Sequence, residues 1–324
     1  INKTNLKYSN SYPLLEKGFS NEDIMRGIEV LLSGKITMSE VTKKFENYFA
    51  KYVGSKYAVA VTSCTAGLHL ASIVSKLKKG KNLLTSPITF VSTANSSLFC
   101  GANTVFADID KSTINLSPNN IKRVILKKKI HAIAPVHFAG LPCDMLQIKK
   151  IANKIGAAVY EDAAHAFGAS YADGSKVGSC KYSDMTVFSF HPVKSIATGE
   201  GGVITTNDKN KYLQLLKLRN HGLEKKQKNF QLKNQSLSGN LNNPWYYEMQ
   251  ELGFHYRITD IQCALGLSQL KKIKKFLHKR RQLAEKYDFA FNNLKNCEPV
   301  QKNMRKLSSN HLYILNIDFK KIGK

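Results

Sequence analysis

A lysine on a short loop is the residue of this sequence best suited to covalent chemistry. Lys194 follows the apolar run 185–190 and precedes Gly199, Gly201 and Gly202, which allow the backbone to turn tightly. The amine of a lysine can bond to the carbonyl carbon of an aldehyde, provided that it is desolvated enough to lose its proton. Because most lysines are solvated surface charges, the features around Lys194 decide whether this chemistry is expected.

A carboxylate follows another apolar run. Glu161 and Asp162 come directly after residues 157–160, at the expected carboxyl end of a strand, and ligands of open α/β sheets bind at that edge. A carboxylate there can keep a pyridinium nitrogen protonated, which makes the ring of a cofactor an electron sink. Taken alone, the pair fits a surface acidic cluster at a strand end equally well.

A third feature is a turn of small hydroxyl residues, 62–66, where a strand-like run changes into a helical pattern. The free N–H groups of a helix N-terminus, together with hydroxyls, can bind a phosphate, although ordinary helix capping is the simpler interpretation. Ser189 can add a further hydroxyl. Phe90, just beyond another strand-like run, can stack on a flat ring or belong to the core.

Short apolar runs alternate with helical patterns along the first two thirds of the chain. This alternation predicts an α/β fold in which helices sandwich a mostly parallel central sheet. The expected strands are 57–61, 82–86, 104–109, 131–136, 157–161, 185–190 and 202–206. The expected helices are 39–53, 65–77, 89–100, 117–128, 144–155 and 208–220.

The last third of the chain has a different pattern. Residues 224–239 are polar and rich in Lys, Asn and Gln, which predicts a long surface loop. Residues 259–262, Thr-Asp-Ile-Gln, fit a capping box that opens a helix to about Leu294, roughly 50 Å long. We expect a large domain over 1–240. Residues 241–324 should hold a connecting helix and the start of a smaller C-terminal α+β domain that looks truncated.

Composition narrows the class of protein. A chain of 324 residues with 43% hydrophobic residues is typical of a globular protein, and no apolar stretch is long enough to span a membrane. The first residues lack the pattern of a signal peptide. The six cysteines form no C-x-x-C pair and no zinc-like spacing with histidine. We therefore expect no metal site, no membrane partner, and reduced thiols in a cytoplasmic protein.

The net charge of +26 raises a different possibility, a basic nucleic-acid-binding protein without catalysis. The lysines, however, are spread along the whole chain, which favours a dispersed basic surface with some charge near an anionic substrate. We expect no nucleic-acid partner, because nucleic-acid binding leaves the combination of Asp162 and Lys194 unexplained.

Several strings resemble the DegT/DnrJ/EryC1/StrS family of nucleotide-sugar aminotransferases, which are pyridoxal-phosphate enzymes of fold type I. They are SCTAGLHLA, SPITFVSTAN, VFADID, PVHFAGLPCDM, YEDAAHAFGASY, FSFHPVKSIATGEGG, LRNHG, YRITDIQCALGLSQL and SSNHLY. The resemblance covers the chain from about Gly34 onward. It implies pyridoxal 5′-phosphate as the cofactor, a homodimer with shared active sites, and amino transfer from L-glutamate to a nucleotide-linked keto-sugar.

The runs that begin at Ser189 and Pro244 look closest to family members of pseudaminic acid biosynthesis. Those members aminate a UDP-linked 4-keto-6-deoxy sugar. Aminotransferases of GDP-perosamine or dTDP-amino-sugar type remain the alternative. Relatives that dehydrate deoxysugars carry histidine in place of the cofactor-binding lysine, so Lys194 argues against dehydration.

The resemblance also implies roles for single residues. It puts the covalent bond to the cofactor on Lys194, the contact to the pyridine nitrogen on Asp162, and ring stacking on Phe90. His165 falls where the family has a glutamine or histidine beside the ring. Phosphate contacts are expected from Cys64, Thr65 and Ser189.

Three positions depart from the family pattern. Cys64 replaces a usual Gly, Ala or Ser in the phosphate turn, which is tolerable if its backbone N–H is the donor. Residues 37–40, Thr-Met-Ser-Glu, replace a Thr-x-Gly-Pro motif on the sugar side. His255, in GFHYR, takes the place of an asparagine that reaches the phosphate site of the neighbouring subunit.

Overall fold

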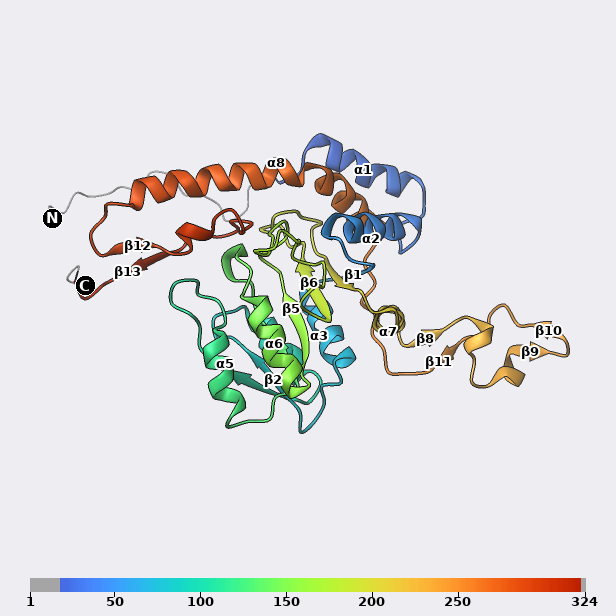
Figure 1. The fold of residues 1–324 in the computed structure, drawn as a ribbon. Helices are drawn as coiled ribbons and strands as arrows, with labels where there is room; N and C mark the ends of the chain where they lie inside the picture. Colours follow the sequence, from blue (N-terminus) through green and yellow to red (C-terminus); the bar gives the residue numbers. More distant parts are fainter. Residues whose placement is uncertain (1–17, 322–324) are drawn as a thin grey trace.

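The computed structural model describes residues 18–321, so the stretch in which no signal peptide is expected lies outside the described residues. A seven-stranded sheet forms the centre of the molecule, flanked by helices (Figure 1). Its strands, in spatial order, are β1 (Tyr57–Val61), β7 (Gly202–Thr206), β6 (Met185–Ser189), β5 (Ala158–Asp162), β4 (Ala132–Ala134), β2 (Asn82–Thr85) and β3 (Asn103–Phe106). Only β7 runs antiparallel to its neighbours in this sheet, so the expectation of a mostly parallel sheet is confirmed.

The sheet is covered on both faces because side chains alternate between two cores along each strand. Val187 and Ile204 belong to one core, while their neighbours Phe188 and Val203 belong to the other. The helices are α1 (Asn21–Leu32), α2 (Glu40–Val53), α3 (Cys64–Val74), α4 (Val91–Leu98), α5 (Pro118–Ile125), α6 (Met145–Ile155), α7 (Lys209–Arg219) and α8 (Asp260–Phe291). Each expected helix is present, with ends that differ by at most three residues from the expected ones.

The long helix α8 begins as its sequence predicts. The Thr259 side chain accepts a hydrogen bond from the backbone N–H of Gln262, and the Gln262 side chain reaches back to Thr259. The first half of α8 packs against α1 and α2, and its far end lies near a small two-stranded sheet, β12 (Cys297–Pro299) and β13 (Leu315–Ile317). The division into domains at residue 240 stays a prediction.

The polar stretch expected as a loop is more regular than its composition indicates. It forms an arm that projects from the body of the molecule (Figure 1). Within it, β8 (Leu223–Glu224) pairs with β11 (Glu248–Met249), and β9 (Leu237–Ser238) pairs with β10 (Leu241–Asn242). The Glu248 carboxylate also accepts hydrogen bonds from the backbone N–H groups of Gln231 and Leu232. These contacts are mainly to the backbone, so a polar sequence without alternating apolar residues can still form them.

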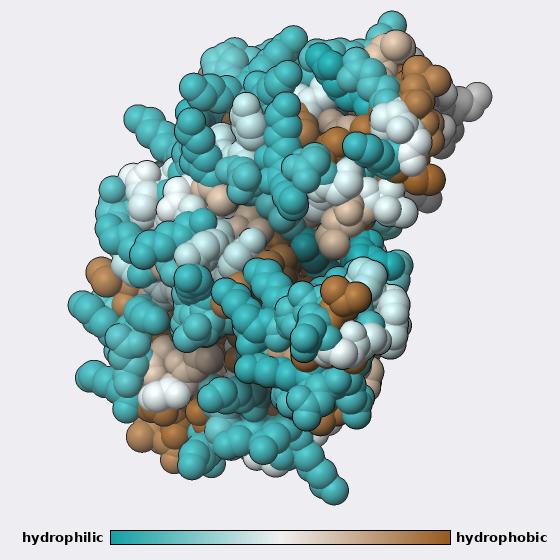
Figure 2. Space-filling model, turned by 90° about the vertical axis from the view of Figure 1, so that its right-hand side faces the viewer, coloured by the Kyte–Doolittle hydropathy of each residue, from teal (hydrophilic) through white to brown (hydrophobic). Residues whose placement is uncertain are grey.

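The surface is dominated by polar and charged groups. Figure 2 shows a mostly hydrophilic face on which apolar residues form separate patches. From residue 18 to residue 321, no helix combines the length and the apolar character that crossing a membrane requires.

Candidate active site

A cavity of about 440 Å³ lies at the carboxyl ends of the central strands. The chain reaches it from the ends of β1, β2, β5 and β6, as expected for an open α/β sheet. Seven of the residues predicted from the sequence line this one cavity: Cys64, Thr65, Phe90, Asp162, His165, Ser189 and Lys194. The fold therefore brings together side chains that are up to 130 positions apart in the chain.

The turn between β1 and α3 has the geometry of a phosphate site. Ser63 caps α3, and its hydroxyl accepts a hydrogen bond from the backbone N–H of Ala66 at 3.1 Å. The first-turn N–H groups of Cys64 and Thr65 are thereby presented at a helix N-terminus, where anions bind. Gly202 makes room for this turn, because a Cβ there would lie 2.7–2.8 Å from the backbone of Ser63 and Cys64.

The carboxylate of Asp162 is buried and held by donors on both oxygens. Its Oδ2 accepts a hydrogen bond from the Thr93 hydroxyl at 2.6 Å, and its Oδ1 accepts one from the backbone N–H of Ala164 at 3.1 Å. Asp162 is 4% exposed at the end of β5. A fixed carboxylate of this kind is suited to hold a cationic ring nitrogen.

Lys194 lies in the same cavity, on the loop after β6. Burial lowers the pKa of its amine because the charged form is desolvated, although Cys64 and Asp162 nearby oppose this shift. The amine is therefore easier to deprotonate than that of a surface lysine.

Burial raises the pKa of the Cys64 thiol well above its usual range, with a further contribution from Asp162. Cys64 is thus a neutral thiol, and its backbone N–H remains the group available to a phosphate.

Two histidines contact each other near Lys194, with their ring planes tilted by 38°. The ring centroids of His165 and His311 are 4.5 Å apart, and the Nδ1 atoms of both rings are buried without a hydrogen-bond partner. Burial, with Lys194 as a second cause, lowers the pKa of His165 to about 3. Both rings are therefore neutral near pH 7. Sequence reasoning missed His311, although it lies in the string SSNHLY.

Several other residues of the cavity wall were not predicted. They are Ser63, Thr89, Ser92, Val136, Ala164, His191, Val193 and Glu200. All but Val136, which follows β4, lie near the same strand ends as the predicted residues, and that position is the signal that could have found them. Thr93, one turn further into α4, touches Asp162 across 69 positions, and nothing in the local sequence indicates that contact.

The first turn of α8 connects two loops of the site. Asp260 accepts hydrogen bonds from the backbone N–H groups of Ser39 and Thr42, at 3.0 and 2.9 Å. Gln262 donates from Nε2 to the carbonyl oxygen of Glu200 at 2.8 Å. The unusual 37–40 segment is therefore anchored to the same turn as the lysine loop.

His255, the eighth predicted residue, does not line the cavity of its own chain. It is exposed, on the segment that follows the arm. Next to it, the carbonyl oxygen of Tyr256 accepts a hydrogen bond from the backbone N–H of Thr62 at 3.1 Å. Its predicted contact with a neighbouring subunit stays a prediction.

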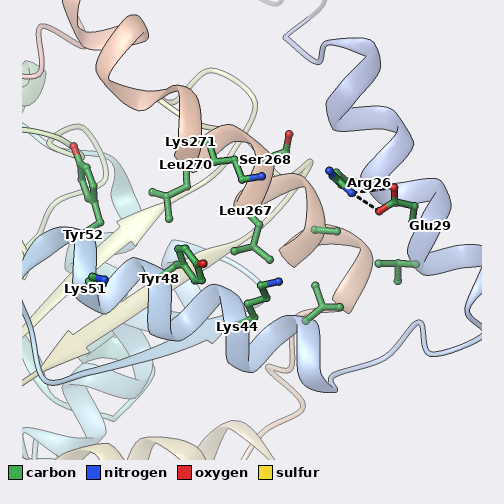
Figure 3. A pocket seen from close by; sticks show the side chains of 13 residues that line it. Arg26, Glu29, Lys44, Tyr48, Lys51, Tyr52, Leu267, Ser268, Leu270 and Lys271 are labelled. Atoms are coloured by element: carbon green, nitrogen blue, oxygen red, sulfur yellow. Dashed lines mark hydrogen bonds and ion pairs between the residues drawn. The ribbon is translucent and has the colours of Figure 1, made fainter.

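A second depression, of about 560 Å³, lies between α1, α2 and α8 (Figure 3). Lys44, Lys51 and Lys271 stand around it, and Arg26 and Glu29 pair with each other at its edge. None of the predicted site residues lines it. The chemistry of this chain is therefore assigned to the cavity with Lys194.

Comparison with known proteins identifies the family. The model of the DegT/DnrJ/EryC1/StrS aminotransferase family matches residues 19–324. This chain belongs to that family. It is a pyridoxal-phosphate-dependent sugar aminotransferase of fold type I, as the resemblance implies.

Two curated relatives illustrate the similarity. The spore coat polysaccharide biosynthesis protein SpsC of Bacillus subtilis is 38% identical over 323 residues, which cover 100% of this chain and 79% of the relative. The UDP-4-amino-4,6-dideoxy-N-acetyl-beta-L-altrosamine transaminase of Campylobacter jejuni is 37% identical over 287 residues, which cover 88% of this chain and 69% of the relative.

Solved structures agree with the fold. Helicobacter pylori PseC, an aminotransferase involved in the biosynthesis of pseudoaminic acid, has a TM-score of 0.85 and 30% identity, covering 97% of this chain and 80% of its own. Spr1654 of Streptococcus pneumoniae, solved in its PLP form, has a TM-score of 0.83 and 26% identity, covering 95% of this chain and 79% of its own.

The cavity fits the cofactor of this family. The α3 turn offers backbone donors for a phosphate, and Gly202 leaves space for that turn. His165 lines the same cavity as Asp162 and Lys194, and its buried Nδ1 has no hydrogen-bond partner within the described residues. Asp162 can hold the ring nitrogen, and Lys194 has a desolvated amine for the aldehyde.

Proposed function

We propose that this aminotransferase moves an amino group from L-glutamate to a UDP-linked 4-keto-6-deoxy sugar. The observation that carries the proposal is the single cavity in which the desolvated amine of Lys194, the fixed carboxylate of Asp162 and the α3 turn lie together. In this cavity, Lys194 can form a covalent bond to the cofactor, Asp162 can balance the charge of a ring nitrogen, and the α3 turn can bind a phosphate. Amino transfer needs all three.

When bound, pyridoxal phosphate supplies an aldehyde that exchanges amines and a ring that accepts electron density. Residues of the chain bind the cofactor and move the proton. Lys194 would anchor the cofactor, and its Nζ, once free, would take a proton from the α-carbon of the amino acid and deliver it to the aldehyde carbon of the cofactor, which its lowered pKa permits. Asp162 keeps the proton on the ring nitrogen. Phe90 lines the cavity and would stack on the ring, and the N–H groups of Cys64 and Thr65, with the hydroxyl of Ser189, would hold the phosphate.

The sugar substrate is assigned by analogy. The Campylobacter relative is named for UDP-4-amino-4,6-dideoxy-N-acetyl-beta-L-altrosamine, and this chain shares 37% of its residues with it over most of its length. The surplus of positive charge suits a substrate that carries a diphosphate. A GDP- or dTDP-linked keto-sugar is the alternative acceptor.

Two further properties belong to the proposal. Two copies assemble as a homodimer, in which His255 of one chain reaches the phosphate site of the other. The protein works in the cytoplasm, where the reducing conditions suit its six free cysteines.

The first experiment tests the cofactor and the amino donor. The purified protein, loaded with pyridoxal phosphate, should show a visible absorbance band that L-glutamate bleaches and that 2-oxoglutarate restores. L-Aspartate and L-alanine serve as control donors. A band that no amino acid bleaches would contradict the assignment.

The second experiment tests the acceptor. The bleached protein is mixed with UDP-, GDP- and dTDP-linked 4-keto-6-deoxy sugars, and the sugar amine and the returning band are measured. We expect the UDP-linked sugar to react with the highest kcat/KM. Preference for a GDP- or dTDP-linked sugar would select the alternative acceptor and leave the amino transfer intact.

A further inference from the structure

The carboxylate of Asp162 does not stand alone: it ends a chain of two hydroxyl groups, the half-buried one of Thr89 and the buried one of Thr93. Thr89, in the cavity wall, lies with its Oγ1 at 2.8 Å from the Oγ1 of Thr93, and that oxygen lies at 2.6 Å from Oδ2 of Asp162. Thr93 is fully buried, at 0% exposed. The loop before α4 thus reaches the end of β5 through two hydroxyls.

The direction of these hydrogen bonds follows from the number of protons. Thr93 has one hydroxyl hydrogen, and a carboxylate is the stronger acceptor for it than the carbonyl oxygen of Phe90, which is 3.4 Å away. Since Thr93 donates to Asp162, the hydroxyl of Thr89 must donate to Thr93. The chain of donors therefore runs from the cavity wall to Oδ2.

We propose that Thr93, supported by Thr89, is a positioning residue that keeps Asp162 oriented and keeps the proton on the ring nitrogen of the cofactor. The inference rests on the proposed role of Asp162. A donor to a carboxylate weakens the hold of that carboxylate on any further proton. With the Thr93 hydroxyl in place, a proton shared between Asp162 and the ring nitrogen stays on the ring. Without it, the proton moves toward the carboxylate.

The consequence concerns the chemical step more than substrate binding. A ring that has lost its proton is a weaker electron sink, so the reacting carbon loses its proton more slowly. Thr93 lies in the first turn of α4, contacts Asp162 and does not line the cavity, so we expect that glutamate does not touch it. We therefore expect kcat to fall while KM for glutamate changes little.

The test uses Thr93→Val, which replaces the hydroxyl by a methyl group of similar size, and Thr93→Ser, which keeps the hydroxyl. The kcat of Thr93→Val should fall by roughly tenfold or more, because a hydrogen bond to a charged group is lost, with KM for glutamate within about threefold of the wild type. Thr93→Ser should keep most of the activity. Equal loss in both variants would overturn the role of the hydroxyl.

A second readout is independent of turnover. Protein loaded with cofactor that carries ¹⁵N in the ring should show, by NMR, a protonated ring nitrogen in the wild type and in Thr93→Ser. In Thr93→Val the resonance should move toward that of an unprotonated pyridine. An unchanged resonance in Thr93→Val would overturn the inference, whatever the stability of the variant.

Ser97→Ala is the matched control, because it removes another buried hydroxyl from α4. Ser97 bonds to Thr104 and to the carbonyl oxygen of Ala94, away from Asp162. Its removal should leave kcat and the ¹⁵N resonance unchanged. If Ser97→Ala shifts both as Thr93→Val does, the effect belongs to the packing of α4 and the inference is wrong.

A double-mutant cycle separates this inference from the proposed function. Asp162→Asn alone should lose most of the activity, and adding Thr93→Val to it should cost little more. If Asp162→Asn is fully active, the proposed function of Asp162 fails. If Asp162→Asn is inactive but Thr93→Val is normal, only the inference about Thr93 fails.

Discussion

The rings of His165 and His311 lie with their centroids 4.5 Å apart and their planes tilted by 38°, and neither buried Nδ1 atom has a hydrogen-bond partner within the described residues. Burial is the main cause that lowers the pKa of His165 to about 3 and that of His311 to about 2. Positive charge adds to it: Lys194 acts on both rings, and Arg280 acts on His311. The pair is therefore neutral in the folded protein at pH values where a free histidine is already charged.

The first prediction follows from this pair. In the unfolded chain a histidine titrates near 6.5, so below pH 6.5 the unfolded state binds more protons than the folded state. The free energy of unfolding is therefore highest above pH 6.5. It decreases as the pH falls below 6.5, by at most about 1.4 kcal/mol per pH unit for each histidine.

Urea unfolding of the apo-protein at pH 7.5, 6.5 and 5.5 measures this effect. His311→Leu should flatten the pH dependence of the free energy of unfolding, because one of the two groups is gone. His278→Gln, on the exposed side of α8, should leave it unchanged. A pH dependence in His311→Leu equal to that of the wild type would contradict the prediction.

The second prediction concerns Lys194. Lys194→Ala should bind pyridoxal phosphate weakly at most and lose transamination by roughly a thousandfold or more, because anchor and proton carrier disappear together. Lys194→Arg keeps the charge but cannot lose its proton, so it should be equally inactive. Stopped-flow absorbance after mixing with glutamate checks both variants. Normal turnover in either one would refute the assignment of Lys194.

The third prediction concerns the fit of the phosphate turn. A Cβ on Gly202 would meet the backbone of Ser63 and Cys64 at 2.7–2.8 Å, so Gly202→Ala must displace the turn that we propose binds the phosphate. The dissociation constant of pyridoxal phosphate should rise by roughly tenfold or more. Gly27→Ala is the control, since its Cβ makes only ordinary contacts at 3.8–3.9 Å with α8. Equal cofactor affinity in both variants would contradict the prediction.

The fourth prediction concerns a buried ion pair under the sheet edge. Arg219 on α7 lies 2.5 Å from the Glu46 carboxylate on α2, and Glu46 also accepts a hydrogen bond from the backbone N–H of Ala60. Arg219→Met leaves Glu46 buried without its partner and should cost about 3–5 kcal/mol of unfolding free energy. Arg26→Met breaks an exposed pair with Glu29 and should cost less than about 1 kcal/mol. Urea midpoints of the two variants decide the matter.

Much of the fold could be predicted because its signals are local. The strands β5 and β6 are buried on both faces, which the sequence shows as short, mainly apolar stretches. The capping box of α8 is also local, since Thr259 and Gln262 are three positions apart. The strand ends then indicated Asp162 and Lys194 as residues that meet at one edge of the sheet.

The remaining features depend on contacts that no local pattern contains. Thr93 reaches Asp162 across 69 positions, and Ser309, two positions before the missed His311, bonds to the carbonyl oxygen of His165 across 144 positions. The strand pairing within the arm also depends on contacts between residues that are distant in the sequence. Backbone hydrogen bonds join β8 to β11, and a composition rich in polar residues does not reveal them. Resemblance supplied the cofactor roles, but the partners that hold the cofactor residues in place came from the structure.

The last prediction concerns His255 and the homodimer. His255 is exposed and does not line the cavity of its own chain, yet it belongs to a segment bonded to the phosphate turn through Tyr256 and Thr62. In the proposed dimer its imidazole donates a hydrogen bond to the phosphate bound by the other subunit, as an asparagine does in relatives. His255→Ala should then weaken the affinity for pyridoxal phosphate several-fold, and His255→Asn should largely preserve it.

Mixed dimers make this test specific. In the mixed dimer, one chain carries Lys194→Ala and the other carries His255→Ala. Both defects fall in one active site if His255 serves the other subunit, and each site has one defect if His255 serves its own chain. If His255 serves the other subunit, the intact lysine of the second chain meets an intact His255 from the first, and that site keeps wild-type cofactor affinity. If His255 serves its own chain, the only site with a lysine also lacks the histidine, and its affinity falls to that of the His255→Ala homodimer. A fully active monomer by light scattering would overturn the shared site altogether.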